Sequence, residues 1–110
     1  MYYISNKLFI NFKIVAMVNK NIISVRKKLD KLDNNLLNII KKRQNLVDIV
    51  IKNKIFKKDI IDKKRISIIL KNISIKSKKR NIDPKITNKI WKAMINAFID
   101  YEFRNFYKKK

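Results

Sequence analysis

Three charged residues fall on or beside apolar faces of the predicted helices, where a charge needs a partner. Arg43 interrupts a run of apolar residues spaced by three and four, Arg65 has apolar residues four positions away on either side, and Glu102 follows the apolar stripe of the last helix. A buried charge without a partner is costly, so these groups either pair with one another or gather around an anionic ligand. Arginine suits the second role because its planar fork can hold a carboxylate with two hydrogen bonds.

The composition excludes most other kinds of catalytic chemistry. The chain of 110 residues contains no Cys, no His and no Gly. These absences exclude a thiolate metal site, a histidine-dependent triad and a glycine-rich phosphate loop. Tight β-hairpins favour Gly at positive φ, so we do not expect an all-β fold. We expect a single α-rich domain without metal or cofactor, whose usable chemistry is that of Lys, Arg and a few carboxylates.

A net charge of +21 can indicate a protein that binds nucleic acid or an anionic membrane. However, Lys (24 residues), Ile (22) and Asn (14) dominate the chain, and these are the residues of A- and T-rich codons. The lysine clusters at 54–64 and 108–110 are not interleaved with aromatic residues as in known nucleic-acid motifs. We interpret the charge as a solvated surface that attracts small anionic substrates, with a basic helical nucleic-acid-binding module as the alternative.

Residues 1–20 are expected to be an extension of uncertain structure ahead of a helical domain at 21–110. The apolar stretch at 8–18 is interrupted by polar residues. It is shorter than the ~20 apolar residues that a membrane span needs, and it makes a poor signal peptide. We therefore expect a cytoplasmic protein with no membrane partner, and Met17 is a candidate alternative start.

Apolar residues repeat at steps of three and four from Ile22, which is typical of a helix with a heptad seam. The apolar members of this seam are Ile22, Val25, Leu29, Leu32, Leu36, Ile39, Leu46 and Val50. The pattern predicts a helix that ends near Ile55, about 34 residues and ~50 Å long. Such a helix cannot bury its stripe within one compact monomer of this size, so we expect a homodimer.

Two further helices are predicted after the long one. Apolar residues at helical spacing cover about Ile60 to Ile75. Asp83 and Pro84 are typical of an N-cap and a first helical residue, and they open a third helix that reaches Glu102. The predicted fold is all-α, with one long, one short and one intermediate helix per chain.

The order of these motifs resembles the all-helical (AroQ-class) chorismate mutases. That family opens approximately LRxxIDxLDxxLLxLLxxR, and residues 25–43 read VRKKLDKLDNNLLNIIKKR. Three further family features follow in order, a lysine, a DxxR box and a third helix that ends in Gln or Glu, at Lys54, Asp62–Arg65 and residues 82–102. The resemblance covers about residues 22–104, and it implies an intertwined dimer of three-helix chains with active sites shared between protomers.

The resemblance implies the rearrangement of chorismate to prephenate, a step of aromatic amino acid biosynthesis. This Claisen rearrangement needs no nucleophile, metal or cofactor, because the protein only has to hold a folded dianion and stabilise charge on its ether oxygen. By resemblance, Arg26 would reach into the partner's site to bind one carboxylate and Arg43 would bind the other. Lys54 would bind a carboxylate and the ether oxygen.

The resemblance gives the remaining site residues supporting roles. Arg65 would support the charge network, and Asp62 would lie near the substrate hydroxyl. Glu102 would be a second hydrogen-bond donor to the ether oxygen, which requires it to be protonated. We therefore expect activity to fall as pH rises, with a flatter profile in Glu102→Gln.

Three departures from the family pattern leave alternatives open. Ile66 replaces the Glu of the family's DxxRE box, and Phe98 replaces a small polar residue. The segment before Asp62 is about one residue short, so Lys52 is the alternative to Lys54 as the site lysine. The alternative functions on this scaffold are an isochorismate-pyruvate lyase-like enzyme and a catalytically impaired mutase-like regulator.

Overall fold

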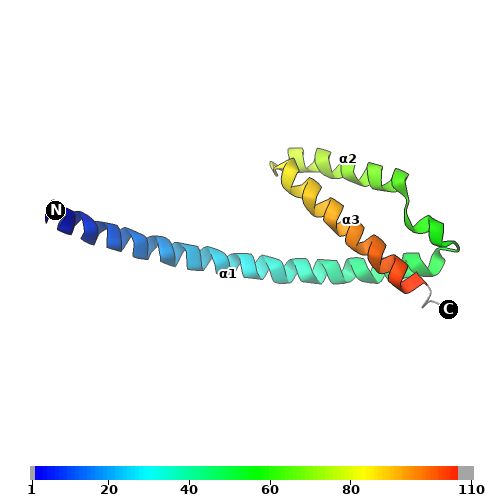
Figure 1. Cartoon of the computed structure of the whole chain (residues 1–110), viewed down its shortest axis with the longest axis horizontal. Coiled ribbons are helices and arrows are strands. Elements are labelled where there is room, and N and C mark those ends of the chain that lie inside the picture. Colours follow the sequence, from blue (N-terminus) through cyan, green and yellow to red (C-terminus); the bar gives the residue numbers. More distant parts are fainter. Residues whose placement is uncertain (1, 107–110) are drawn as a thin grey trace. The chain divides into compact units, whose positions relative to one another are not determined.

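The computed structural model describes residues 2–106, with side chains from residue 13 onward. It consists of α1 (Tyr2–Asn53), a short 3₁₀ helix η1 (Lys57–Ile60), α2 (Lys63–Lys79) and α3 (Pro84–Phe106) (Figure 1). No strand occurs among the described residues. The predicted all-α fold with one long, one short and one intermediate helix is confirmed, at 52, 17 and 23 residues.

Helix α1 begins far earlier than the predicted start at Ile22. It runs from Tyr2 to Asn53 without a break, because no Gly or Pro interrupts this part of the sequence. Residues 2–20, expected to be of uncertain structure, are therefore helical. The domain boundary at residue 20 stays a prediction.

The chain divides into two units, Met1–Lys41 and Lys42–Lys110. Within the first unit, every side chain from residue 13 to residue 41 is exposed in the single chain. This includes the members of the predicted heptad seam up to Ile39, among which Leu32 is 60% and Leu36 is 53% exposed. The apolar face of this part of α1 is thus uncovered within one chain.

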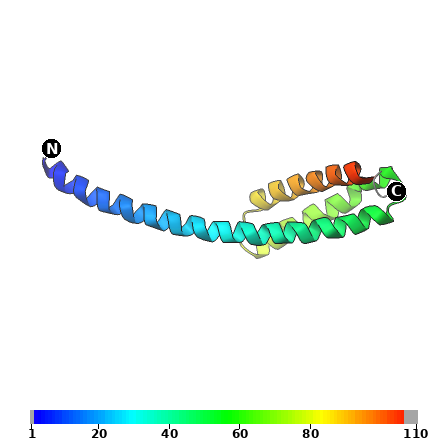
Figure 2. The same ribbon diagram turned by 90° about the horizontal axis from the view of Figure 1, so that it is seen from below.

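The second unit contains the end of α1, η1, α2 and α3 (Figure 2). Helices α2 and α3 run antiparallel and are joined by a short turn (Figure 1). The buried apolar residues of the described chain are few, and all lie in this unit: Ile51, Ile60, Ile95 and Phe106. A buried hydrogen bond of 2.7 Å joins Ser77 Oγ of α2 to Thr87 Oγ1 of α3.

Side-chain caps explain where α2 and α3 begin. The Asp62 carboxylate accepts a hydrogen bond of 2.9 Å from the backbone N–H of Arg65, so α2 begins at Lys63 and not at Ile60 as predicted. The Asp83 carboxylate accepts from the N–H of Lys85 at 2.9 Å, and α3 begins at Pro84 as predicted.

The turn between α2 and α3 needs a residue at positive φ. In a chain without Gly this is Asn81, with φ of 56°. The N–H of Ile82 donates to the Ser77 carbonyl and the N–H of Asn81 to the Lys78 carbonyl, at 2.9 and 3.2 Å. These two bonds form a Schellman motif, which ends α2 and turns the chain back along it.

None of the helices described here combines the length and the hydropathy that a membrane crossing demands.

Candidate functional site

A pocket of about 390 Å³ lies within the second unit and brings five charged residues together. They come from the end of α1, the start of α2 and the C-terminal half of α3: Arg43, Lys54, Asp62, Arg65 and Glu102. The rest of the lining is apolar and consists of Val50, Ile60, Ile66, Ile69, Ile95, Phe98 and Ile99. Five of the six residues singled out from the sequence thus line one pocket, although they span 60 positions of the chain.

The sixth residue, Arg26, belongs to the first unit and does not line this pocket. It lines an apolar hollow of about 350 Å³ along α1, together with Val18, Asn21, Ile22, Val25 and Leu29. Arg26 is exposed in the single chain.

Lys54 and Glu102 form an ion pair in the pocket. The Lys54 Nζ donates to both carboxylate oxygens of Glu102 at 3.3 Å. Glu102 is 7% exposed, and the Lys54 side chain is 21% exposed. Removal of one partner would leave the other as an unpaired, largely buried charge. Such a charge lowers the stability of the fold far more than the intact ion pair does. Glu102 thus pairs with a lysine, and not with either of the arginines considered from the sequence.

Lys52, the alternative site lysine, is exposed and does not line the pocket. Helix α1 ends at Asn53, and the backbone N–H of Lys54 still bonds to the last turn, to the Val50 carbonyl at 3.1 Å. Lys54 is therefore held close to the helix end, where its side chain reaches Glu102 of α3.

Arg43 has no such carboxylate partner among the described residues. Its Cζ lies 5.6 Å from the centroid of the Phe98 ring, within the range of a cation–π contact. Its Nε is buried and has no hydrogen-bond partner in the part of the chain that the structure describes. An unsatisfied buried donor costs about 1–3 kcal/mol, so an anionic ligand that accepts from Arg43 would recover this energy.

A hydrogen-bond network between α1 and α3, beside Phe98, was not predicted from the sequence. The Tyr101 hydroxyl donates to Asp48 Oδ1 at 2.5 Å and accepts from Gln44 Nε2 at 3.4 Å. The Tyr101 ring meets the Phe98 ring edge-on, with centroids 6.4 Å apart. The hydrogen bond to Asp48 raises the pKa of the Tyr101 hydroxyl above its ordinary value of 10. Gln44 and Asp48 share a face of α1, but their spacing alone does not reveal a partner on α3.

Asp62 and Arg65 line the pocket from its exposed side. One oxygen of Asp62 accepts the capping hydrogen bond from the backbone of Arg65. The DxxR spacing therefore has a structural role, since it begins α2 and fixes where the Arg65 side chain leaves the helix.

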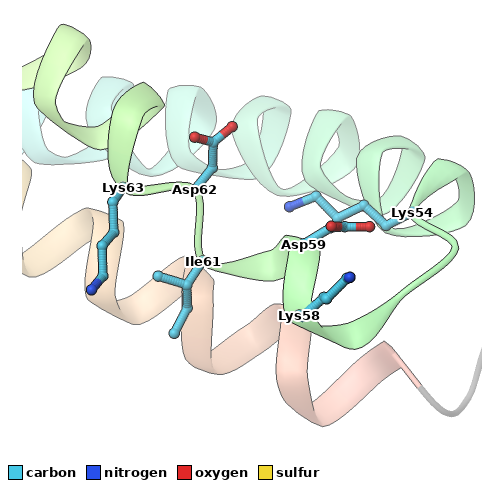
Figure 3. Close-up of a pocket in the computed structure, with 6 residues that line it drawn as sticks. All are labelled: Lys54, Lys58, Asp59, Ile61, Asp62 and Lys63. Carbon is cyan, nitrogen blue, oxygen red and sulfur yellow. The ribbon is translucent and has the colours of Figure 1, made fainter.

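A wider hollow of about 740 Å³ shares Lys54 and Asp62 with the pocket. Its other lining residues are Lys58, Asp59, Ile61 and Lys63. In Figure 3 the side chains of Asp62 and Lys63 point to opposite sides of the chain. Arg43, Arg65 and Glu102 do not line this hollow, so we base the site on the smaller pocket, where these three residues converge with Lys54 and Asp62.

The described residues hold no cluster of three or more His, Cys, Asp or Glu side chains that could bind a metal ion. The pocket combines three cations and two carboxylates with an apolar lining. Such an arrangement can bind a small dianion and stabilise negative charge as it develops.

The comparisons with known proteins give one result. The family model described as chorismate mutase type II matches residues 25–103, which is most of the chain. No curated protein and no solved structure matches the chain significantly.

Proposed function

The chain belongs to the chorismate mutase type II family, a family of isomerases, and on this premise we propose that it converts chorismate to prephenate. The observation that carries the proposal is the convergence of Arg43, Lys54 and Glu102 on one apolar pocket. The reaction breaks the ether C–O bond and forms a C–C bond within one molecule. It needs a site that holds a compact conformer and stabilises negative charge on the ether oxygen.

We propose that Arg43 binds one substrate carboxylate with the donors of its guanidinium. Its unpaired, buried Nε supports this role, because a carboxylate would satisfy it. Lys54 would bind the ether oxygen and a carboxylate, and Arg65 would add positive charge at the exposed side. Asp62 would lie near the substrate hydroxyl.

Glu102 would be the second donor to the ether oxygen. In the free protein it is paired with Lys54 at 3.3 Å. A carboxylate cannot donate a hydrogen bond, so Glu102 must take up a proton before it can donate one to the ether oxygen. By this route the Lys54–Glu102 ion pair must break, and each of the two side chains must then donate a hydrogen bond to the substrate.

The proposed assembly is a homodimer in which Arg26 of each chain completes the site of its partner. The exposed apolar face of α1 supports a partner chain, because thirteen large apolar side chains between residues 14 and 40 are at least 37% exposed. Arg26 lies on that part of the helix, outside the pocket of its own chain. A cytoplasmic role in the route to phenylalanine and tyrosine is proposed with it.

Two lining residues motivate a second candidate, a catalytically impaired mutase-like regulator. Ile66 and Phe98 both line the pocket, where the family pattern has Glu and a small polar residue. Ile66 would remove one partner for the substrate hydroxyl, and the Phe98 ring would leave less room for the substrate. This candidate would form the dimer and bind a protein partner without turnover.

The test is incubation of the purified protein with chorismate, followed by the loss of its ultraviolet absorbance and identification of the product. Prephenate supports the proposal. Pyruvate would identify an isochorismate-pyruvate lyase-like enzyme instead, and a folded dimer without turnover would favour the regulator. Salt-sensitive DNA binding that survives Arg43→Ala, again without turnover, would favour the basic nucleic-acid-binding module.

A further inference from the structure

A second pocket in the same unit is not used by the proposed reaction. It has a volume of about 360 Å³ and is lined from all three helices by Arg43, Arg65, Ile69, Asn72, Ile73, Lys76 and Trp91. It shares Arg43, Arg65 and Ile69 with the substrate pocket, so the two cavities adjoin. Lys54, Asp62 and Glu102 do not line it.

The two pockets differ in their balance of charge. The substrate pocket contains two carboxylates, Asp62 and Glu102, in addition to its three cations. The second pocket has the cations Arg43, Arg65 and Lys76 and no carboxylate in its lining. The ion pair between Lys54 and Glu102 involves none of these three cations.

The buried Nε of Arg43, which has no hydrogen-bond partner, is a second sign that an acceptor is missing. The Asn72 side chain adds an amide donor to the lining, and Ile69, Ile73 and Trp91 form apolar walls. Three uncompensated cations with a free donor favour a compact anion that carries two charges.

We propose that this pocket is a binding site for a small dianionic oxyanion, and that its occupant competes with the substrate for Arg43 and Arg65. The competition rests on the proposed function, whereas the binding itself does not. Inorganic phosphate and malonate have the required charge and size, and they distinguish a tetrahedral oxyanion from a dicarboxylate.

Trp91 makes the binding measurable without turnover, because it is the only Trp of the chain and lines the pocket. The full chain is titrated with phosphate, and separately with malonate, while Trp91 fluorescence is recorded at constant ionic strength. Lys76→Gln is compared with Lys71→Gln, which removes the same charge from an exposed position of α2 outside the pocket.

We expect a saturable change in Trp91 fluorescence with at least one of the two anions. Lys76→Gln should weaken the apparent affinity by about fivefold or more, while Lys71→Gln and Lys76→Arg should stay within about twofold, because only a charge in the pocket contacts the anion. Absence of saturation with both anions in the wild-type chain, or equal weakening in Lys76→Gln and Lys71→Gln, would overturn the proposal.

Kinetics then test the competition. Where chorismate is turned over, the bound anion should raise KM without lowering kcat, and Lys76→Gln should reduce this inhibition. Inhibition that lowers kcat alone would contradict a shared Arg43. Saturable binding in a protein that does not turn over chorismate would leave the anion site intact and reject the proposed function.

Discussion

Residues 13–41 and residues 42–106 are both helical, but they differ in what they bury. Between residues 13 and 41 every side chain is exposed in the single chain, including the leucines of the heptad seam. The second region contains every buried residue of the described chain and the pocket with its ion pair. The contrast teaches that the two parts of one continuous helix, α1, differ in role: its first part leaves its apolar face exposed, where we propose that a partner binds, and its last part carries Arg43 into the pocket.

The small core supports our proposal that a partner chain covers α1. Four apolar residues are buried in the described chain, and most of the stability of a helix in a protein comes from the tertiary packing of its apolar face. Burial of apolar surface contributes about 25 cal/mol per Å² to stability. If a partner chain buried the exposed seam of α1, the free energy of unfolding would therefore rise considerably.

The largest effect is expected from a charge in the seam. Leu36→Lys places an ammonium where we propose that two chains meet, and it should abolish the dimer and lower turnover by about 100-fold or more, because an unpaired buried charge is not tolerated. Analytical ultracentrifugation, thermal unfolding and the chorismate assay measure the three consequences.

The matched control is Asn34→Lys, which adds the same charge at an exposed position outside the seam. It should remain dimeric and active. Equal loss of the dimer in both variants would mean that the added charge, and not its place on the seam, is responsible.

The next effect separates the two candidate site lysines. Lys54→Met removes the partner of a largely buried Glu102 and a proposed contact to the ether oxygen, so kcat/KM should fall about 100-fold and the protein should be less stable. Lys52→Met alters an exposed residue outside the pocket and should change kcat/KM less than about twofold. The opposite order would assign the site to Lys52.

Glu102→Gln tests whether residue 102 donates a hydrogen bond to the ether oxygen of the substrate. Glutamine donates a hydrogen bond at every pH, whereas glutamic acid donates only while protonated. Wild-type activity should therefore fall as pH rises, and the variant should give a flatter pH–rate profile. An equally steep profile in Glu102→Gln would remove Glu102 from this role.

A smaller effect is expected at Phe98. Phe98→Leu removes the ring that lies 5.6 Å from Arg43, and cation–π contacts contribute about 0.5–2 kcal/mol, so KM should rise between about twofold and 30-fold. Phe103→Leu is the control, because it removes a ring beside Lys57 that does not line the pocket. A lower KM in Phe98→Leu would show that the ring obstructs the substrate.

Much of this arrangement could be predicted from residue spacing. The heptad steps predicted the long helix, and Asp83 with Pro84 predicted the start of α3, because caps are local. The charges on apolar faces singled out Arg43, Arg65 and Glu102, and the family resemblance added Lys54 and Asp62. All five line one pocket.

Other features depend on contacts that spacing does not determine. The pairing of Lys54 with Glu102 joins residues 48 positions apart, and the bond between Tyr101 and Asp48 joins residues 53 positions apart. The continuation of α1 to Tyr2 was missed because the polar residues among 1–20 obscure the apolar pattern, although no helix breaker stops it. The cap at Asp62 was missed because the sequence suggested only a substrate contact for it.

Mixing two inactive variants tests most directly whether the two regions cooperate across chains. Arg26→Ala damages the first region and Arg43→Ala the second, and the two proteins are unfolded and refolded together in equal amounts. Random pairing makes half of the dimers mixed, and each mixed dimer has one intact site, so we predict about a quarter of the wild-type activity. Activity no higher than the average of the two separate variants would contradict sites shared between protomers.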